Sequence, residues 1–314
     1  MSTRPRSRHA LTPAIAAVIL LLCPAARAQQ RDLSAVEVKA EKVAEGIYML
    51  TGAGGNIGIS VGADGVLLID DQFAQLSEKI RTAVAAITDR PIRFILNTHW
   101  HGDHTGGNEN FARAGVTILA HDNVRRRLGA EQFNALFDRR TPPSPPEALP
   151  VVTFSDEITF HMNGDSIVAF HVPPAHTDGD AIVLFARADV VHMGDCFFNG
   201  MYPVIDVSAG GSLDGMIAAA GRMLARVSER TRIIPGHGPL GDRAGLRAFR
   251  DMLVAARDRI RPLVQAGKSA DEVVAAKPTA ELDAKWGTGF MTPERFVRAA
   301  YASLSGKLPA ASHP

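Results

Sequence analysis

The chain has 314 residues, of which 46% are hydrophobic, so it can bury a sizeable core in one large domain or two small ones. Its 34 basic and 33 acidic residues give a formal net charge of +1. This balance argues against a nucleic-acid partner, which usually requires a surplus of basic residues.

The N-terminal segment is typical of a secretory signal peptide. Three arginines in the first eight residues precede an apolar run over residues 14–22, which is too short to span a membrane. The small residues around Ala28 form a cleavage site, so we predict a signal peptide over residues 1–28 and a periplasmic or secreted protein without a membrane anchor. Cleavage would remove Cys23 and leave Cys196 alone, so we expect no intrachain disulfide.

The next part of the chain is expected to begin with a loose polar lead-in over residues 29–42. Short apolar runs over 47–50, 57–61 and 66–70, separated by glycine-rich turns, predict a meander of antiparallel strands, and apolar positions at helical spacing predict helices. The expected strands are 47–50, 57–61, 66–70, 92–97 and 116–120, and the expected helices are 74–87, 122–128 and 131–140. The proline-rich segment 141–146 reads as a stiff connection, with a wall beside the active site as the alternative.

The second half repeats the pattern of strands followed by helices. The expected strands are 151–154, 158–161, 166–172, 182–185, 190–193 and 232–235, and the expected helices are 213–227, 243–264, 269–275 and 293–304. Two such halves, around residues 44–140 and 150–260, fit two stacked sheets with helices on the outside.

Four potential metal ligands follow the apolar run 92–97, namely His99, His101, Asp103 and His104. A loop at the carboxyl end of a strand is where ligands bind in open α/β sheets, and imidazole and carboxylate suit zinc. The side chains of His99 and His101 flank one residue and point the same way in an extended segment, so they can hold one ion as a pair. Asp103 and His104 diverge from that pair and could serve a second ion. The alternative, a polar loop with hydrogen-bonding histidines, explains this dense pattern less well.

The loop is similar to the metal-binding loop of the metallo-β-lactamase superfamily. Three later motifs resemble the other ligand motifs of these hydrolases, in the same order: 174–180 with His176, 192–196 with Asp195, and 233–239 with His237. The resemblance covers about residues 43–253, and it is more specific for the fold than for the substrate.

The resemblance implies a layered α/β (α+β) fold, the four-layer αββα sandwich, with metals at one edge between the sheets. We therefore expect one such domain over residues 43–265 and a C-terminal helical extension over 266–314. It also implies two zinc ions per chain. His99, His101 and His176 would hold the first ion, Asp103, His104 and His237 would hold the second, and Asp195 would bridge them. Each of the later three ligands could instead stabilise a turn or contact backbone.

A pair of zinc ions sharing a water would make hydroxide available near neutral pH, since zinc can lower the pKa of bound water to about 7. We therefore expect a metal-dependent hydrolase that attacks an amide or ester-type carbonyl of a small molecule, with Asp103 steering the nucleophile. β-Lactamase-like activity is the first hypothesis. A thioesterase of glyoxalase II type or a lactonase is the second, which Asp195 favours. A mononuclear iron enzyme, such as a persulfide dioxygenase, is the third.

Several neighbouring residues have open roles. Cys196 could be a ligand, as in the cysteine-containing subclass of metallo-β-lactamases, but His104 already supplies a nitrogen to the second site, so we expect a core residue. That subclass has a substrate-binding lysine three positions after its cysteine, where this chain has Asn199. We therefore expect weak or narrow lactamase activity. Asp70 is expected to orient a ligand histidine. Residues 204–206 and 210–211 are candidates for shaping the pocket, and Met201 and Tyr202 are candidates for lining it.

Overall fold

The computed structural model describes Met1 and residues 32–308. The signal peptide predicted over residues 1–28 lies outside the described residues, apart from Met1. The elements below all belong to the unit that begins at Leu33.

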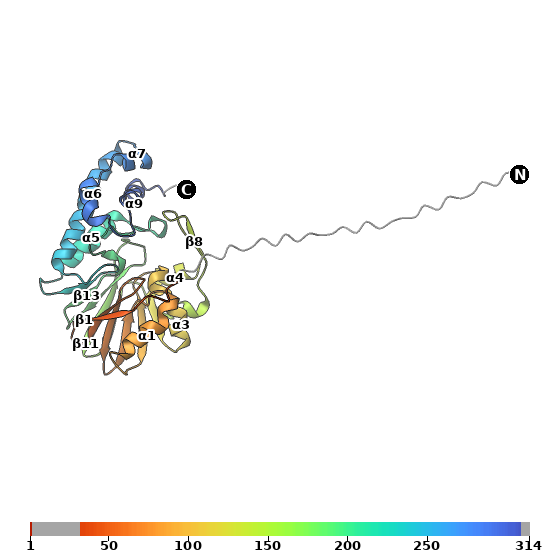
Figure 1. The fold of residues 1–314 in the computed structure, drawn as a ribbon, viewed down its shortest axis with the longest axis vertical. Helices are drawn as coiled ribbons and strands as arrows, with labels where there is room; N and C mark the ends of the chain where they lie inside the picture. The colour runs from red at the N-terminus through yellow and green to blue at the C-terminus, as the bar shows by residue number, and fades with distance from the viewer. Residues whose placement is uncertain (2–31, 309–314) are drawn as a thin grey trace. The chain divides into compact units, whose positions relative to one another are not determined.

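The first sheet has seven strands, and its strands lie in the order in which they occur along the chain: β1 (Lys39–Ala44), β2 (Ile47–Thr51), β3 (Ile57–Gly62), β4 (Gly65–Ile69), β5 (Ile92–Asn97), β6 (Thr117–His121) and β9 (Val152–Phe154). Figure 1 shows α1 (Ser77–Ala85) beside the strands of this sheet. The pairs from β1 to β4 are antiparallel, whereas β4, β5, β6 and β9 are mutually parallel. The antiparallel series predicted from the sequence is confirmed. The lead-in predicted over residues 29–42 ends earlier than expected, because Lys39 to Lys42 pair with β2 as an exposed edge strand.

The second sheet has five strands, in the order β10 (Glu157–Met162), β11 (Asp165–His171), β12 (Ala181–Phe185), β13 (Val190–His192) and β14 (Arg232–Ile234). Its neighbours are antiparallel except β13 and β14, which are parallel. The carboxyl ends of β13 and β14 therefore meet at one edge of the sheet, with His192 paired to Ile234.

The described helices are α1 (Ser77–Ala85), α2 (Gly102–Thr105), α3 (Asn108–Arg113), α4 (Asp122–Leu128), α5 (Leu213–Leu224), α6 (Arg243–Gln265), α7 (Ala270–Ala275), α8 (Ala280–Trp286) and α9 (Pro293–Ser305). Short 3₁₀ turns cover Ala74–Leu76, Pro146–Ala148, Gly194–Cys196 and Val207–Ala209. Side-chain caps fix several helix starts: Ser212 accepts from Gly215 N at 3.2 Å, and Asp242 accepts from Gly245 N at 2.8 Å. No helix in the described part of the chain is long and apolar enough to cross a membrane.

Alternating apolar residues divide the structure into four layers. In β4, Leu67 and Ile69 face the second sheet and pack with residues such as Val183, whereas Leu68 faces the opposite side and packs with Ile80 of α1. The outer face of the second sheet packs against α5, α6 and α9 through a third apolar cluster. The αββα sandwich is therefore confirmed.

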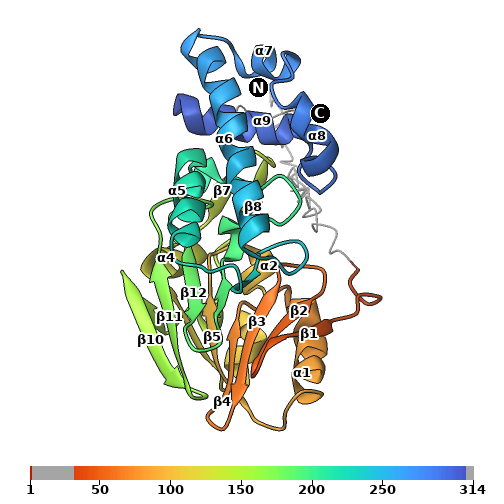
Figure 2. The same ribbon diagram turned by 90° about the vertical axis from the view of Figure 1, so that its left-hand side faces the viewer.

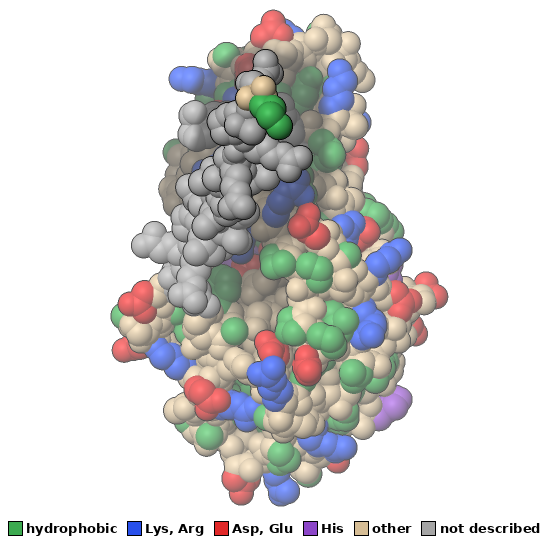
Figure 3. All heavy atoms as spheres, turned by 90° about the vertical axis from the view of Figure 1, so that its right-hand side faces the viewer, with side chains coloured by type: hydrophobic (Ala, Val, Ile, Leu, Met, Phe, Trp, Pro, Cys, Tyr) green, Lys and Arg blue, Asp and Glu red, His purple; other side chains and the backbone are tan. Residues whose placement is uncertain are grey.

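The C-terminal helices extend the outer layer beyond the sheets. Figure 2 shows α6 running from the sheets toward α7, α8 and α9, and α9 packs against α5, α6 and α7. Phe296 of α9 stacks on Tyr202 with ring centroids 4.2 Å apart, and both side chains are fully buried. On the face drawn in Figure 3, acidic and basic side chains are interspersed, as the balanced composition predicts.

One predicted helix is wrong. Residues 131–140 do not form a helix but contribute to a hairpin of β7 (Gln132–Asn134) and β8 (Arg139–Thr141). The side chain of Asn134 accepts hydrogen bonds from Leu136 N and Phe137 N, at 3.1 and 3.2 Å, and Asp138 adopts a left-handed φ of 46°. Local turn chemistry thus outweighs the helical propensity of the segment.

Candidate metal centre

The seven side chains predicted as metal ligands lie together at one edge of the two sheets. His99 and His101 directly follow β5, and Asp103 and His104 lie in α2. The other three come from the second sheet: His176 from the β11–β12 loop, Asp195 from the turn after β13, and His237 from the loop after β14. Strand ends far apart in sequence therefore supply one site.

The donor atoms form two adjacent groups. One contains His99, His101, His176 and Asp195, the other contains Asp103, His104 and His237, and the donor atoms of each group lie within 4.8 Å of one another. Close pairs include His176 Nε2 and His101 Nδ1 at 2.8 Å, and His237 Nε2 and Asp103 Oδ2 at 3.4 Å. Tetrahedral donors about 2.0–2.1 Å from a zinc ion would be about 3.3 Å apart, so each group fits one ion.

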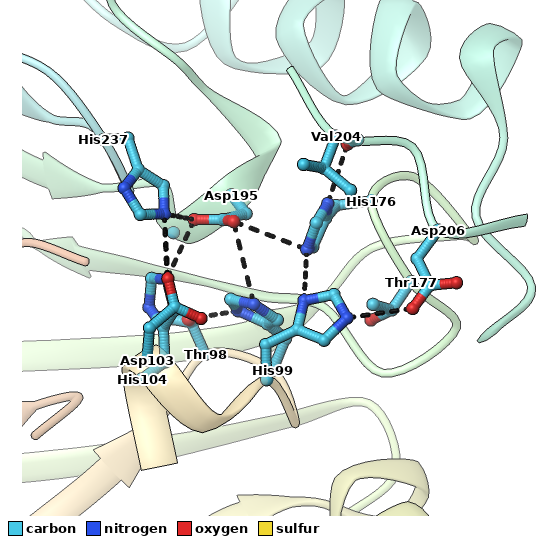
Figure 4. A network of polar contacts seen from close by, with 12 residues as sticks. Thr98, His99, Asp103, His104, His176, Thr177, Asp195, Val204, Asp206 and His237 are labelled. Carbon is cyan, nitrogen blue, oxygen red and sulfur yellow. Dashed lines mark hydrogen bonds and ion pairs between the residues drawn. The ribbon is translucent and has the colours of Figure 1, made fainter. Parts of the chain in front are cut away.

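Asp195 lies between the two groups. Its Oδ2 is 3.4 Å from His176 Nε2 and 3.8 Å from His99 Nε2, whereas its Oδ1 is 3.1 Å from His104 Nε2 and 3.5 Å from His237 Nε2. Figure 4 shows this carboxylate with His237 on one side and His176 on the other. One oxygen therefore faces each group, as a bridging ligand requires.

Two buried atoms in this cluster have no hydrogen-bond partner, His99 Nε2 and Asp195 Oδ1. A buried polar atom without a partner costs about 1–3 kcal/mol, so native structures rarely leave one unsatisfied. A metal ion in each group would satisfy both atoms. The unsatisfied atoms and the mixture of imidazole and carboxylate donors fit a pair of borderline metal ions.

Each of four histidines is oriented through its other ring nitrogen. His104 Nδ1 lies 2.8 Å from Asp70 Oδ2, and His101 Nε2 lies 2.9 Å from Asp206 Oδ2. The other two make such contacts to Thr98 Oγ1 and to the carbonyl of Val204, which lie 3.1 Å from His99 Nδ1 and 2.8 Å from His176 Nδ1. These contacts direct the remaining nitrogen of each ring into the centre.

The surroundings shift the pKa values of the clustered histidines in different directions. Burial lowers the pKa of His99 well below its usual value and also lowers that of His176. Burial acts in the same direction on His237, but Asp195 and Asp103 outweigh it and raise the pKa of His237 to about 9. Burial would raise the pKa of Asp195, but His237 and His104 hold it well below its usual range. Asp195 is therefore a carboxylate, with two negative oxygens to offer.

Tight backbone packing supports the ligands. A Cβ on Gly55 would lie 2.0 Å from the ring of His104, and one on Gly236 would lie 2.0 Å from Asp195 Oδ1, so both positions need glycine. Asp180 holds the His176 loop by accepting from His176 N at 2.6 Å and Thr177 N at 2.9 Å.

Cys196 belongs to neither donor group. Its thiol is buried 3.7 Å from Asp180 Oδ2, and burial together with Asp180 raises its pKa well above the usual value, which disfavours the thiolate that metals bind. Asn199 donates to Pro239 O at 2.9 Å. Tyr202 is buried in the core, whereas Val204 lines the cavity beside the centre.

A cavity of about 270 Å³ opens onto the centre. Besides His101, Asp103, His176, Asp195 and His237, it is lined by Phe73, Trp100, Gly102, Asn134, Phe137, Arg139, Thr141, Val204 and Phe290. Of the proline-rich segment, only Thr141 lines this cavity, so the segment is mainly a connection. The sequence did not mark Asn134, Phe137 and Arg139 as lining residues, because their segment was expected to be a helix, and it did not mark Phe290, because no local motif identifies that residue.

Comparison with known proteins agrees with this geometry. The model of the family described as "Metallo-beta-lactamase superfamily" matches residues 51–240. The hydroxyacylglutathione hydrolase of Nitrosococcus oceani is 28% identical over 161 residues, which cover 50% of this chain and 52% of that protein. The chain thus spans about half the length of this curated relative.

Solved structures show the same fold at low identity. A metallo-beta-lactamase from Pontibacter korlensis is 20% identical with a TM-score of 0.57, over 69% of this chain and 99% of that one. The sec-alkylsulfatase Pisa1 from Pseudomonas sp. is 18% identical with a TM-score of 0.65, over 84% of this chain and 50% of that one.

Proposed function

Because the chain belongs to the metallo-β-lactamase superfamily and is a metal-dependent hydrolase, we propose that it is a dinuclear zinc enzyme that cleaves an amide or ester-type carbonyl in a small molecule. The observation that carries this proposal is the carboxylate of Asp195, which offers one oxygen to each donor group. Zinc held by these residues would act as a Lewis acid and would lower the pKa of bound water to about 7.

The residues around the centre have distinct roles in this proposal. Asp103 is the more exposed of the two carboxylates, with 31% of its side chain accessible against 5% for Asp195, and it lines the cavity. Asp103 is therefore placed to orient an attacking water. The rings of Trp100, Phe137 and Phe290 form apolar walls that exclude bulk water from the reacting carbonyl.

We propose two candidate substrate classes for this site. β-Lactams are the first, supported by the fold shared with metallo-β-lactamases. Thioesters or lactones are the second, supported by the bridging position of Asp195 and by the sequence similarity to hydroxyacylglutathione hydrolases. Asn199 supplies no cation at this position, because it is a neutral amide engaged with Pro239 O, so a carboxylate of either substrate class has to be bound elsewhere in the cavity.

The proposal is tested with a substrate panel of nitrocefin-type lactams, lactones and thioesters. Purified protein is assayed as isolated, after chelation, and after zinc is returned, with metal content measured in each state. We expect turnover of at least one class, its loss on chelation and its recovery with zinc. A protein that holds two zinc ions per chain and hydrolyses none of the three classes would refute the proposed reaction.

We further propose that the protein is exported to the periplasm or secreted, on the basis of the basic and apolar N-terminal segment. The test is N-terminal sequencing of protein from the periplasmic and culture fractions of the native host. Export predicts a mature chain that begins at Gln29, whereas full-length protein confined to the cytoplasm would refute it.

A further inference from the structure

The β7–β8 hairpin forms one wall of the cavity beside the metal centre. It contributes Asn134, Phe137, Arg139 and Thr141 to the lining. Among the described residues that line this cavity, Arg139 is the sole arginine or lysine. The hairpin therefore brings one positive side chain to a site whose two lining carboxylates already face histidines.

The register of the hairpin separates two adjacent arginines. Arg139 pairs with Asn134 across the strands, and both line the cavity, whereas Arg140 pairs with Phe133. Successive side chains of a strand point to opposite faces, so Arg140 points away from the cavity. Its guanidinium is 2.8 Å from Glu131 and lies over the ring of Phe133. Arg140 is thus a natural control for Arg139.

The hairpin is held in place at several points. The side chain of Asn134 caps its turn, Ala135 N donates to Ser208 Oγ at 3.0 Å, and Arg127 donates to Gln132 Oε1 at 2.9 Å. Arg295 of α9 lies over the ring of Phe137, with 5.9 Å between the guanidinium carbon and the ring centroid. The wall that carries Arg139 is therefore anchored to the body of the domain.

Arg139 itself makes no ion pair or side-chain hydrogen bond within residues 32–308. By contrast, Arg140 pairs with Glu131, and Arg127 pairs with Asp178. A guanidinium has five donors in a planar fork that matches a carboxylate. An arginine that lines a cavity and makes no ion pair is available to an anionic ligand.

We propose that Arg139 binds a carboxylate of the substrate, and that the substrate is an acyl compound carrying one carboxylate and one apolar group. The apolar group lies among Trp100, Phe137 and Phe290, and the scissile carbonyl reaches the metal centre. This inference rests on the proposed hydrolase function and adds to it the substrate class. It also places the anion-binding residue on the hairpin. In the cysteine-containing subclass, by contrast, the substrate-binding lysine lies at the position of Asn199.

The experiment uses two matched thioesters, S-phenylacetyl thioglycolate and S-phenylacetyl thioglycolamide, which differ only in carboxylate against neutral amide. Zinc-loaded wild type, Arg139→Ala, Arg139→Lys and Arg140→Ala are compared. For the carboxylate, Arg139→Ala should raise KM about 10- to 100-fold with kcat nearly unchanged, as the loss of a charge-assisted hydrogen bond predicts. The amide should be unaffected, Arg139→Lys should recover part of the loss, and Arg140→Ala should match wild type.

Calorimetry with an unreactive ligand separates this inference from the proposed reaction. Binding of S-benzylthioglycolate and its amide, neither of which has a thioester to cleave, is measured for the same variants. A preference for the carboxylate that is lost in Arg139→Ala supports the inference, even if no thioester is hydrolysed and the reaction is refuted. Equal effects on both ligands, or no effect of Arg139→Ala, would overturn the inference and leave the hydrolase proposal standing.

Discussion

At the scale of single residues, the metal centre depends on histidines in which one ring nitrogen contacts a protein group and the other is left to face the metal. His176 is fully buried, with Nδ1 on the carbonyl of Val204 and Nε2 in the first donor group. Losing this ring removes one of the four donors of that group.

We expect His176→Ala or His101→Ala to abolish hydrolysis, by about a thousandfold or more in kcat, and to lower zinc content, because metal ions supply several kcal/mol of transition-state stabilisation. Kinetics on the best substrate of the panel and metal analysis measure both effects. His161→Ala, which changes an exposed strand histidine outside both groups, is the control. Undiminished activity in both ligand variants would remove the mechanism.

Asp206 orients His101 through the 2.9 Å contact to Nε2 and is itself buried. Removing such a partner of a ligand histidine typically costs 10- to 100-fold in metal affinity or activity, so we expect Asp206→Asn to weaken zinc binding about tenfold. Competition with a chromogenic chelator measures the affinity. Asp242→Asn makes the same chemical change at a helix cap that belongs to neither donor group and should leave zinc affinity unchanged. Equal affinity in the two variants would argue against an orienting role for Asp206.

Cys196→Ser tests the alternative ligand. Because the thiol lies outside both donor groups, we expect zinc content to remain near two per chain. The thiol packs in the core, and a buried hydroxyl without a full set of partners is costly, so we expect the free energy of unfolding to fall by about 1–3 kcal/mol. Metal analysis and denaturant unfolding measure the two quantities. A fall to one zinc per chain would make the thiol a ligand.

The sequence predicted the seven positions that the structure brings together in two donor groups, because each lies in a short motif that resembles a ligand motif of the superfamily. It also predicted that Asp70 orients a histidine, and the 2.8 Å contact to His104 agrees. The contact of Asp206 with His101 could not be predicted, because 105 residues separate the two and no local pattern marks the pair.

At the scale of elements, strongly periodic segments were predictable and turn-rich ones were not. The long helix expected over residues 243–264 is α6, with bounds that differ by one residue. The hairpin was missed because its turn depends on a side-chain cap from Asn134 and on the left-handed backbone of Asp138. The spacing of apolar residues does not reveal either feature. The short helix α8 was missed as well.

The packing of α9 on the domain gives an element-scale prediction. Phe296 is fully buried and stacks on Tyr202, so Phe296→Ala should lower the free energy of unfolding by about 3–5 kcal/mol, the usual cost of removing a buried aromatic ring. Denaturant unfolding of the zinc-loaded protein measures this change. Leu308→Ala, at a position 60% exposed, should cost less than about 0.5 kcal/mol. Similar losses in the two variants would mean that α9 does not pack as described.

At the scale of the whole molecule, the two sheets contribute different halves of one site. The first sheet supplies His99, His101, Asp103 and His104, and the second supplies His176, Asp195 and His237. A pair of metal ions between the sheets would join them. Because the complete set of ligands comes together only in the folded chain, folding and metal binding would be coupled. The layered fold was predictable from the repeated pattern of strands and helices, whereas the contact of Arg295 in α9 with Phe137 of the hairpin was not.

The number of zinc ions bound per folded chain tests the central claim most directly. Protein is loaded with excess zinc, dialysed against metal-free buffer and analysed by mass spectrometry of the metal together with quantitative amino-acid analysis. Seven converging donors with Asp195 between them predict a ratio close to two in the wild type. A ratio of one or less in correctly folded wild-type protein would contradict a paired metal centre.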